Sequence, residues 1–302
     1  MKGRFLNRKK ATLIASALGL LVTSGVGLAG PIVTQWSYST DATFTAATFS
    51  GGGGTTNSGT PLPTMDYELS WGATGGDFQN PTNNASLNRS ALTIGSGTAG
   101  TTTGGGPATG SVDTLIGGGP VMANNIGIGV NMTHWNNPIS ASFATLLTGT
   151  IFDTLTLTPT APVAGSPVNA PALTFNFHFA ETPNEGPCAG GTAIPCGDLF
   201  GIFGVPTLNQ GFSYDGNNYL ASVVISDGQG GASPIGTLSD PQCAAIGFGS
   251  GCQGFLTTEE AATTVQFAFV VSTEPVYVPE PATLALMGLG LFGLGYRRFK
   301  SA

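Results

Sequence analysis

Between its two ends, the chain almost entirely lacks positive charge. Of nine Lys and Arg in 302 residues, eight lie in Met1–Lys10 or Arg297–Lys300, and Arg89 alone lies between them. All 16 Asp and Glu lie from Asp41 to Glu280, so this body has one positive against sixteen negative side chains, a net charge of −15. Nucleic-acid affinity rests on Lys and Arg that release counterions, which excludes a nucleic-acid binder. Anionic lipids and acidic polysaccharides should also be repelled, unless a divalent cation bridges the charges.

The body also lacks the usual signatures of catalysis. It has no Gly-x-Ser-x-Gly elbow, and its Gly runs lead into Pro107 and Pro120 instead of the Lys of a phosphate-binding loop. Glu181 and Asp198 form a conceivable carboxylate pair for glycoside hydrolysis, with no positive sign of that role. We therefore predict a protein that is not an enzyme, and a secreted hydrolase is the weaker alternative.

No helical period persists in the body, whereas alternating patterns do. In Leu173–Phe179, Leu and three Phe fall on one face, and Val265–Val271 repeats the arrangement. Ile151–Thr158 and Tyr219–Ser226 also read as strands, and Asp215–Asn218 before the latter reads as a hairpin turn. A content of 41% hydrophobic residues supports a packed core. These patterns predict an all-β, antiparallel, jelly-roll-like β-sandwich.

Three Gly-, Thr- and Pro-rich stretches are expected to be loops, because they bury little apolar surface: Gly51–Thr60, Gly95–Ser111 and Pro159–Pro171. The first two stretches offer a boundary between an N-terminal β-rich piece and the main sandwich. We prefer one domain, residues 30–278, with long loops.

The N-terminus has the pattern of a secretory signal. A basic n-region that ends at Lys10 is followed by the apolar Ala11–Val26, and then by small residues up to Ala29. We predict a signal peptide at residues 1–29, with an uncleaved membrane helix as the rival interpretation. Either way, the body is exported.

The C-terminus, residues 279–302, has a second membrane signal. Pro279, Glu280 and Pro281 precede the apolar Ala282–Tyr296, and Arg297, Arg298 and Lys300 follow. Fifteen residues make a helix of roughly 22 Å, and the flanking aromatic and basic side chains can extend it toward the bilayer interfaces. This tail resembles the PEP-CTERM sorting signal. The resemblance implies an inner-membrane intermediate, removal of the helix by an exosortase, and a Gram-negative bacterial host.

Four cysteines form two close pairs, Cys188 with Cys196 and Cys243 with Cys252. An even count in an exported chain favours disulfides, and closeness favours these local bridges among the three connectivities. Zinc is the weaker alternative because neither pair has the usual ligand spacing.

Mid-chain, Met132–Ile139 contains Thr133-His134-Trp135-Asn136, and Phe179–Asn184 is followed by Cys188 and Pro195–Asp198. Together with the tail, these segments resemble the THxN family of PEP-CTERM proteins. The resemblance spans Trp36–Pro281 and carries no catalytic residue. It implies placement at the cell surface, outer membrane or extracellular matrix, often in biofilm-forming organisms.

Two interpretations of this motif remain open. In the first, Asn136-Asn137-Pro138 marks a turn in which Thr133 and Asn136 satisfy backbone groups while His134 packs or caps. In the second, Thr133, His134 and Asn136 form a binding site together with three residues downstream: Glu181, Asn184 and Asp198. A buried carboxylate needs a partner, and with so few cations this is His134, a backbone N–H or a metal, for which Ca²⁺ is the candidate.

Other chemistry-bearing side chains have structural interpretations. His178 is expected on the polar, solvent-facing side of its strand. Trp36, Trp71 and Trp135 are expected in the core, although exposed Trp would stack on sugars.

The sequence thus predicts a non-catalytic structural or adhesive protein of the surface or matrix. A Ca²⁺- or glycan-binding module is the alternative. Candidate partners are signal peptidase, exosortase, the membrane before processing, and exopolysaccharide.

Overall fold

The computed structural model describes residues 29–57, 67–98, 100–183, 187–188, 196–202, 208–229, 231–233 and 235–276. The expected terminal helices and the sorting residues Pro279, Glu280, Pro281, Arg297 and Arg298 lie outside these ranges, as does Asn184. Within them, no helix is long and apolar enough to cross a membrane.

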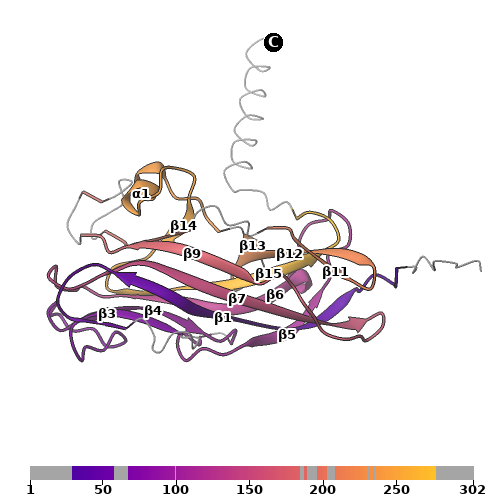
Figure 1. Cartoon of the computed structure of the whole chain (residues 1–302), viewed down its shortest axis with the longest axis horizontal. Helices are drawn as coiled ribbons and strands as arrows, with labels where there is room; N and C mark the ends of the chain where they lie inside the picture. Colours follow the sequence, from indigo (N-terminus) through magenta and orange to yellow (C-terminus); the bar gives the residue numbers. More distant parts are fainter. Residues whose placement is uncertain are drawn as a thin grey trace, which may run out of the picture.

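The described chain is all-β, with two curled antiparallel sheets (Figure 1). The first sheet has the order β14-β10-β9-β7-β1-β5, with β8 paired to β7. Its strands are β1 (Gln35–Phe49), β5 (Ala108–Asp113), β7 (Leu146–Ala161), β8 (Val168–Asn169), β9 (Leu173–Ala180), β10 (Leu199–Ile202) and β14 (Gln253–Leu256).

The second sheet has the order β11-β12-β15-β6-β4-β3-β2, with β13 paired to β12. Its strands are β2 (Thr55–Asn57), β3 (Glu68–Gly72), β4 (Arg89–Gly95), β6 (Ile126–Asn136), β11 (Gln210–Tyr214), β12 (Asn217–Ser226), β13 (Ala232–Ser233) and β15 (Ala261–Ser272). A short helix, α1 (Asp240–Ala245), and a 3₁₀ turn, Ala123–Asn125, are the described helical elements.

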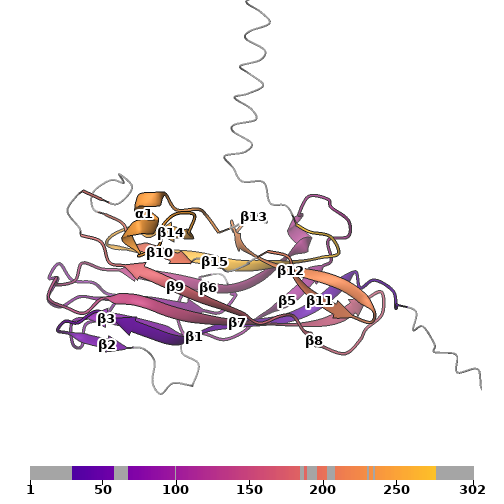
Figure 2. The same cartoon turned by 45° about the horizontal axis from the view of Figure 1, so that its top comes forward.

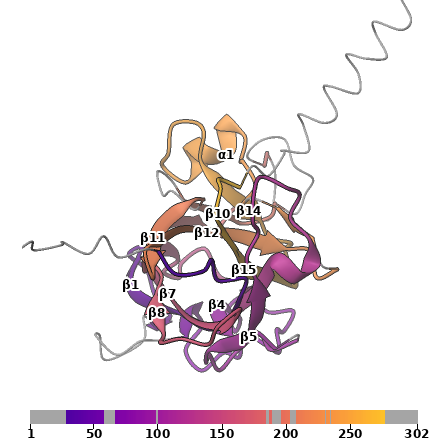
Figure 3. The same ribbon diagram turned by 90° about the vertical axis from the view of Figure 1, so that its right-hand side faces the viewer.

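The main core lies between the two sheets, whose curl is visible end-on in Figure 3. Phe44 and Phe177 of the first sheet pack in one cluster with Leu92 and Met132 of the second. Burial of these apolar faces drives the association of the layers. This arrangement agrees with the expected sandwich.

The alternation predicted for β9 is confirmed, since Phe175, Phe177 and Phe179 are buried. The same expectation fails for β15, where four successive residues, Ala268–Val271, are all buried. Ala268 and Val270 pack with Leu115 and Val276 in a separate cluster. The strand is therefore covered on both faces, which period-two patterning does not reveal.

The predicted strands at Ile151–Thr158 and Tyr219–Ser226 are present and belong to the longer β7 and β12. The hairpin before β12 is tighter than expected: Tyr214 pairs with Asn217, and Asp215 and Gly216 alone form the turn. Both turn residues have positive φ, 47° and 77°, as the primed hairpin turns require.

The expected loops are interrupted by strands. Thr55–Asn57 forms β2, β5 begins at Ala108, and β7 runs on to Ala161 before the short β8. Hydrogen bonding to a neighbouring strand outweighs the weak local propensity of these Gly- and Thr-rich segments.

Candidate functional site

The residues of the Thr-His-x-Asn segment lie on β6, in the middle of the second sheet between β15 and β4. Met132 belongs to the core between the sheets, and alternation places His134 and Asn136 on the same face. Thr133 points the other way and shares a hydrogen bond of 2.9 Å with Thr264. β6 ends at Asn136, so Thr133, His134 and Asn136 all belong to the strand, and His134 lies near its end as the Asn-Asn-Pro sequence predicts.

The strand register brings three further residues to His134. Ala180 of β9 pairs with Leu199 of β10, which pairs with Leu256 of β14. The next residue outward on each strand is Glu181, Asp198 and Thr257, respectively. Adjacent antiparallel strands therefore place these three side chains side by side at one end of the first sheet.

Hydrogen bonds tie this end of the first sheet to the second sheet. His134 Nδ1 lies 2.8 Å from Thr257 Oγ1, and Trp71 Nε1 of β3 donates to Glu181 Oε2 at 2.9 Å. Asp198 Oδ1 accepts from the backbone N–H of Thr182 at 2.7 Å. His134, Asn136, Asp198, Thr257 and Trp71 are at most 2% exposed, so we call them, with Glu181, the buried polar cluster.

Aromatic rings close the cluster on the core side. The Trp71 ring stacks on the His134 imidazole with centroids 5.9 Å apart, and Phe179 meets the imidazole edge-on at 5.0 Å. These rings exclude water from the imidazole and lower the local dielectric.

Three polar atoms of the cluster have no hydrogen-bond partner: His134 Nε2, Asn136 Oδ1 and Asp198 Oδ2. The first and third are 3.8 Å apart, too far for a direct hydrogen bond. Unsatisfied buried polar atoms are rare because each costs about 1–3 kcal/mol. The gap between these atoms is therefore the most distinctive chemical feature of the described structure.

Burial keeps the cluster in its neutral form. It lowers the pKa of His134 to about 3. Burial, with a smaller contribution from the charge of Glu259, raises the pKa of Asp198 to about 8. The pKa of Glu181 is raised well above its ordinary value, first by burial and then by Asp198. Arg89, the one Lys or Arg of the body, donates to Ser70 instead, so no such cation offsets these carboxyls.

The structure thus brings His134, Asn136, Glu181 and Asp198 together, as the shared-site hypothesis expects, and turns Thr133 away. Sequence reasoning missed Thr257 and Trp71, which lie 59 or more positions from the predicted site residues that they bond. In the sequence, the only sign of their role is their position near strand ends. That sign can be used only when the order of strands in each sheet is known.

His178 differs from its expected solvent-facing position. Its Nδ1 lies 2.6 Å from the carbonyl oxygen of Ile246, and its ring stacks on Phe248 at 4.3 Å. The loop after α1 covers this part of β9 and makes His178 half-buried. The core positions expected for Trp36 and Trp71 are confirmed, while Trp135 is half-buried and donates to Thr93.

Both expected disulfides are present, Cys188 to Cys196 and Cys243 to Cys252. The second lies in an apolar cluster with Leu199, Leu238 and Ile246, and it ties α1 to the residue before β14. With all four cysteines paired, the protein has no thiolate for a metal or for nucleophilic catalysis.

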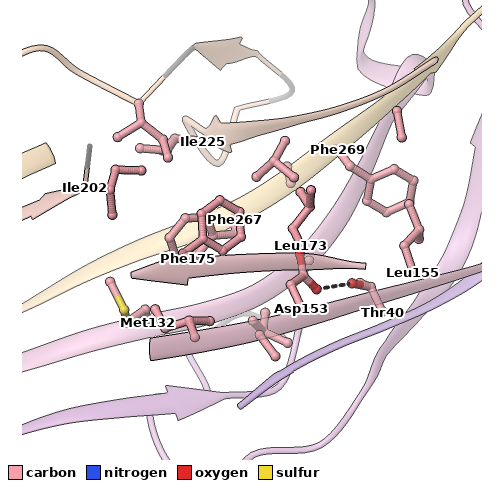
Figure 4. A pocket seen from close by; sticks show the side chains of 18 of the residues that line it. Thr40, Met132, Asp153, Leu155, Leu173, Phe175, Ile202, Ile225, Phe267 and Phe269 are labelled. Carbon is pink, nitrogen blue, oxygen red and sulfur yellow. Dashed lines mark hydrogen bonds between the residues drawn. The ribbon is translucent and has the colours of Figure 1, made fainter. Parts of the chain in front are cut away.

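A second unusual carboxyl lies between the sheets. Asp153 of β7 occupies the same face as the core residues Ile151 and Leu157, and Thr40 Oγ1 donates to it at 3.2 Å. Figure 4 shows this pair among Leu155, Leu173 and Phe175 in a cavity of about 60 Å³. Burial raises the pKa of Asp153 to about 7. Sequence reasoning placed β7 correctly but missed this inward-facing acid.

A comparison with known protein families identifies the tail. No curated protein matches the chain. A model of the PEP-CTERM protein-sorting motif matches residues 278–298, which contain the Pro-Glu-Pro tripeptide and Arg297-Arg298. The all-β, disulfide-containing body therefore precedes a PEP-CTERM sorting motif, which indicates an exported protein directed to an exosortase at the membrane.

Proposed function

We propose that the chain is a non-catalytic structural or adhesive protein that reaches the cell surface, outer membrane or extracellular matrix after exosortase processing. The observation that carries this proposal is the sorting motif at residues 278–298. The two disulfides support it, because such bonds persist in oxidising compartments outside the cytosol. The THxN assignment and the jelly-roll-like class remain predictions of the same proposal.

Mass spectrometry of the mature protein tests the sorting step. In cells with an active exosortase, the C-terminus should lie near Glu280–Ala282, and without the enzyme it should remain at Ala302. A variant that lacks residues 279–302 serves as the control, and its release should not depend on the exosortase. Surface-located protein that keeps Ala302 in exosortase-positive cells would refute the proposal.

The outer face of the first sheet supports an adhesive role. It carries two cross-strand rows of hydroxyls on neighbouring β5, β1 and β7, as the register shows: Ser111, Ser37 and Thr158 in one row and Thr109, Ser39 and Thr156 in the other. Neighbouring strands are about 4.8 Å apart and alternate residues about 6.8 Å. Figure 2 shows these three strands running together along one side of the molecule.

These six side chains are all uncharged, and each is half-buried or exposed. Thr156 is held in place by a hydrogen bond of 2.9 Å to Asn169 of β8. Because the body is strongly anionic, a neutral polysaccharide fits this hydroxyl face better than an acidic one.

Affinity electrophoresis in gels that contain dextran or alginate tests this contact. Dextran should retard the protein and alginate should not. The double variant Ser39→Lys, Thr158→Lys carries two long charged side chains on this face, and dextran should no longer retard it. Thr98→Lys, on an exposed loop, should be retarded like the wild type. Equal retardation of both variants would contradict the assignment of this face.

A further inference from the structure

We propose that the buried polar cluster binds one divalent transition-metal ion between His134 Nε2 and Asp198 Oδ2. This inference goes beyond sorting and adhesion and does not depend on either. It rests on three features of the cluster: which atoms can donate protons, how far the two ligand atoms lie apart, and which positive charges are absent.

Hydrogen bonds around Thr257 determine which imidazole nitrogen is free. The Thr257 hydroxyl donates to the backbone carbonyl of Asp198 at 3.4 Å, so its single proton is already used. We therefore assign the Nδ1–H tautomer to His134, with the Thr257 oxygen as the acceptor. Neutral imidazole carries one N–H, which leaves Nε2 with a lone pair directed into the gap.

Once Asp198 gives up its proton, as a carboxyl ligand does when a metal binds, the gap is surrounded by acceptors. His134 Nε2, the ionised form of Asp198 Oδ2 and Asn136 Oδ1 each offer a lone pair, and none meets a donor. Asn136 contributes to the same network through its amide nitrogen, 3.5 Å from Thr257 Oγ1. A cation between His134 Nε2 and the ionised Asp198 Oδ2 uses both lone pairs and also offsets the buried carboxylate charge, which a bridging water molecule does not do.

The separation of the two ligand atoms suits a small metal ion. Bonds of about 2.1 Å to atoms 3.8 Å apart enclose an angle of about 130°. A closure of about 0.4 Å would bring that angle to the tetrahedral value. The backbone N–H and hydroxyl of Thr182 hold Asp198 Oδ1 and orient the other oxygen toward the imidazole.

Donor chemistry selects the metal. An imidazole nitrogen favours zinc and its first-row neighbours, while calcium takes six to eight oxygens. No group of three His, Cys, Asp or Glu within the described residues is arranged to hold a metal ion. The proposed site therefore uses two such ligands, His134 and Asp198, with solvent to complete it.

A surface hollow lies beside the cluster. Glu181 and His178 line a surface hollow of about 260 Å³, bordered by Leu147 and Ile246. Because Glu181 also accepts from Trp71, its side chain joins this hollow to the buried cluster.

The test is equilibrium dialysis of the full-length chain, with its disulfides intact, against ZnCl₂, CoCl₂ or CaCl₂, followed by elemental analysis. We expect about one zinc per chain, Co²⁺ d–d absorption typical of nitrogen and oxygen ligands, and no retained calcium. Thr257→Val removes the oxygen that accepts the Nδ1 proton of His134, so the imidazole is no longer held with Nε2 toward the metal. This variant should bind zinc about 10–100-fold more weakly.

His134→Gln and Asp198→Asn should each abolish the bound zinc. Matched controls are His178→Gln, the other histidine, and Asp153→Asn, a second carboxyl of raised pKa. If His134→Gln does not fold, the zinc content of Asp198→Asn and the cobalt spectrum of the wild type still test whether the cluster binds a metal ion. If the wild-type protein holds no zinc after dialysis, only a water molecule bridges His134 and Asp198, and the proposal is overturned. Loss of zinc in His178→Gln would overturn it as well.

Discussion

The hydroxyl of Thr257 lies 2.8 Å from Nδ1 of His134, and both side chains are almost completely buried. Thr257 follows β14 at the edge of the first sheet, whereas His134 belongs to β6 in the second. The contact therefore ties the two layers together at one end, where polar groups replace the aromatic core. A hydrogen bond in such a dry environment is worth more than one at the surface, and its loss leaves a buried donor unsatisfied.

Thr257→Val should lower the free energy of unfolding by about 1–3 kcal/mol, because valine keeps the shape and removes the acceptor for the His134 N–H. Urea denaturation at neutral pH measures this loss. Thr160→Val is the control, since Thr160 is exposed at the end of β7, and it should change stability by less than about 0.5 kcal/mol. Equal losses in the two variants would show that the Thr257 hydrogen bond contributes nothing specific.

Asp153→Asn should remove part of the pH dependence of stability. The pKa of Asp153 is raised from 3.8 to about 7 by burial, so the folded protein keeps a proton that the unfolded chain releases above pH 4. Stability from this group is complete below pH 4 and is lost as the pH rises to about 7. At 1.36 kcal/mol per pH unit, the loss is at most about 4 kcal/mol.

Thermal melting of wild type and Asp153→Asn between pH 4 and pH 8 checks this prediction. Glu181 and Asp198 also have raised pKa values and titrate in the same direction, so the informative quantity is the difference between the two proteins. That difference should grow with pH in favour of the Asn variant. A constant difference would mean that Asp153 is already ionised in the folded state.

The sequence was sufficient for those parts of the fold that depend on local pattern. The alternation of Phe175, Phe177 and Phe179 predicts both the strand and its buried face, and the Asp215-Gly216 turn follows from local backbone preference. β5 could not be found in this way, because its six residues form a strand only through pairing with β1. The covering of both faces of β15 depends on distant segments near Leu115 and Val276.

The same distinction between local pattern and contacts of distant segments applies to the candidate site. His134, Glu181 and Asp198 could be proposed from their types and from neighbouring turn residues. Thr257 and Trp71 could not, since their role depends on which strands are neighbours in each sheet. The inward-facing Asp153 was also missed, because an acid at a core position contradicts the pattern by which strands are recognised.

The two disulfides should differ in their contribution to stability. Each closes a loop of about nine residues, so the chain-entropy contribution is about 2.5 kcal/mol for both. Cys243 and Cys252 are fully buried in an apolar cluster, whereas Cys188 is half-buried. Serine at Cys243 and Cys252 also buries two hydroxyls among Leu and Ile, which adds at least about 2 kcal/mol.

Urea denaturation of the two double-serine variants measures this difference. The variant without Cys243–Cys252 should unfold at clearly lower urea concentration than the one without Cys188–Cys196. The reverse order would mean that the Cys188–Cys196 bridge stabilises the polar cluster, through Asp198 two residues away, more than the half-buried position of Cys188 suggests.

Gly216→Ala should destabilise the β11–β12 hairpin by about 1–2 kcal/mol. Gly216 has φ of 77°, where a side chain collides with its own backbone. The matched control is Gly118→Ala, at a position with open space and no positive φ, which should be neutral or slightly stabilising because alanine restricts the unfolded chain. Thermal melting of the two variants beside wild type should therefore give shifts of opposite sign or clearly unequal size. Equal shifts would show that the turn tolerates a side chain and that the β11–β12 register is set by strand pairing alone.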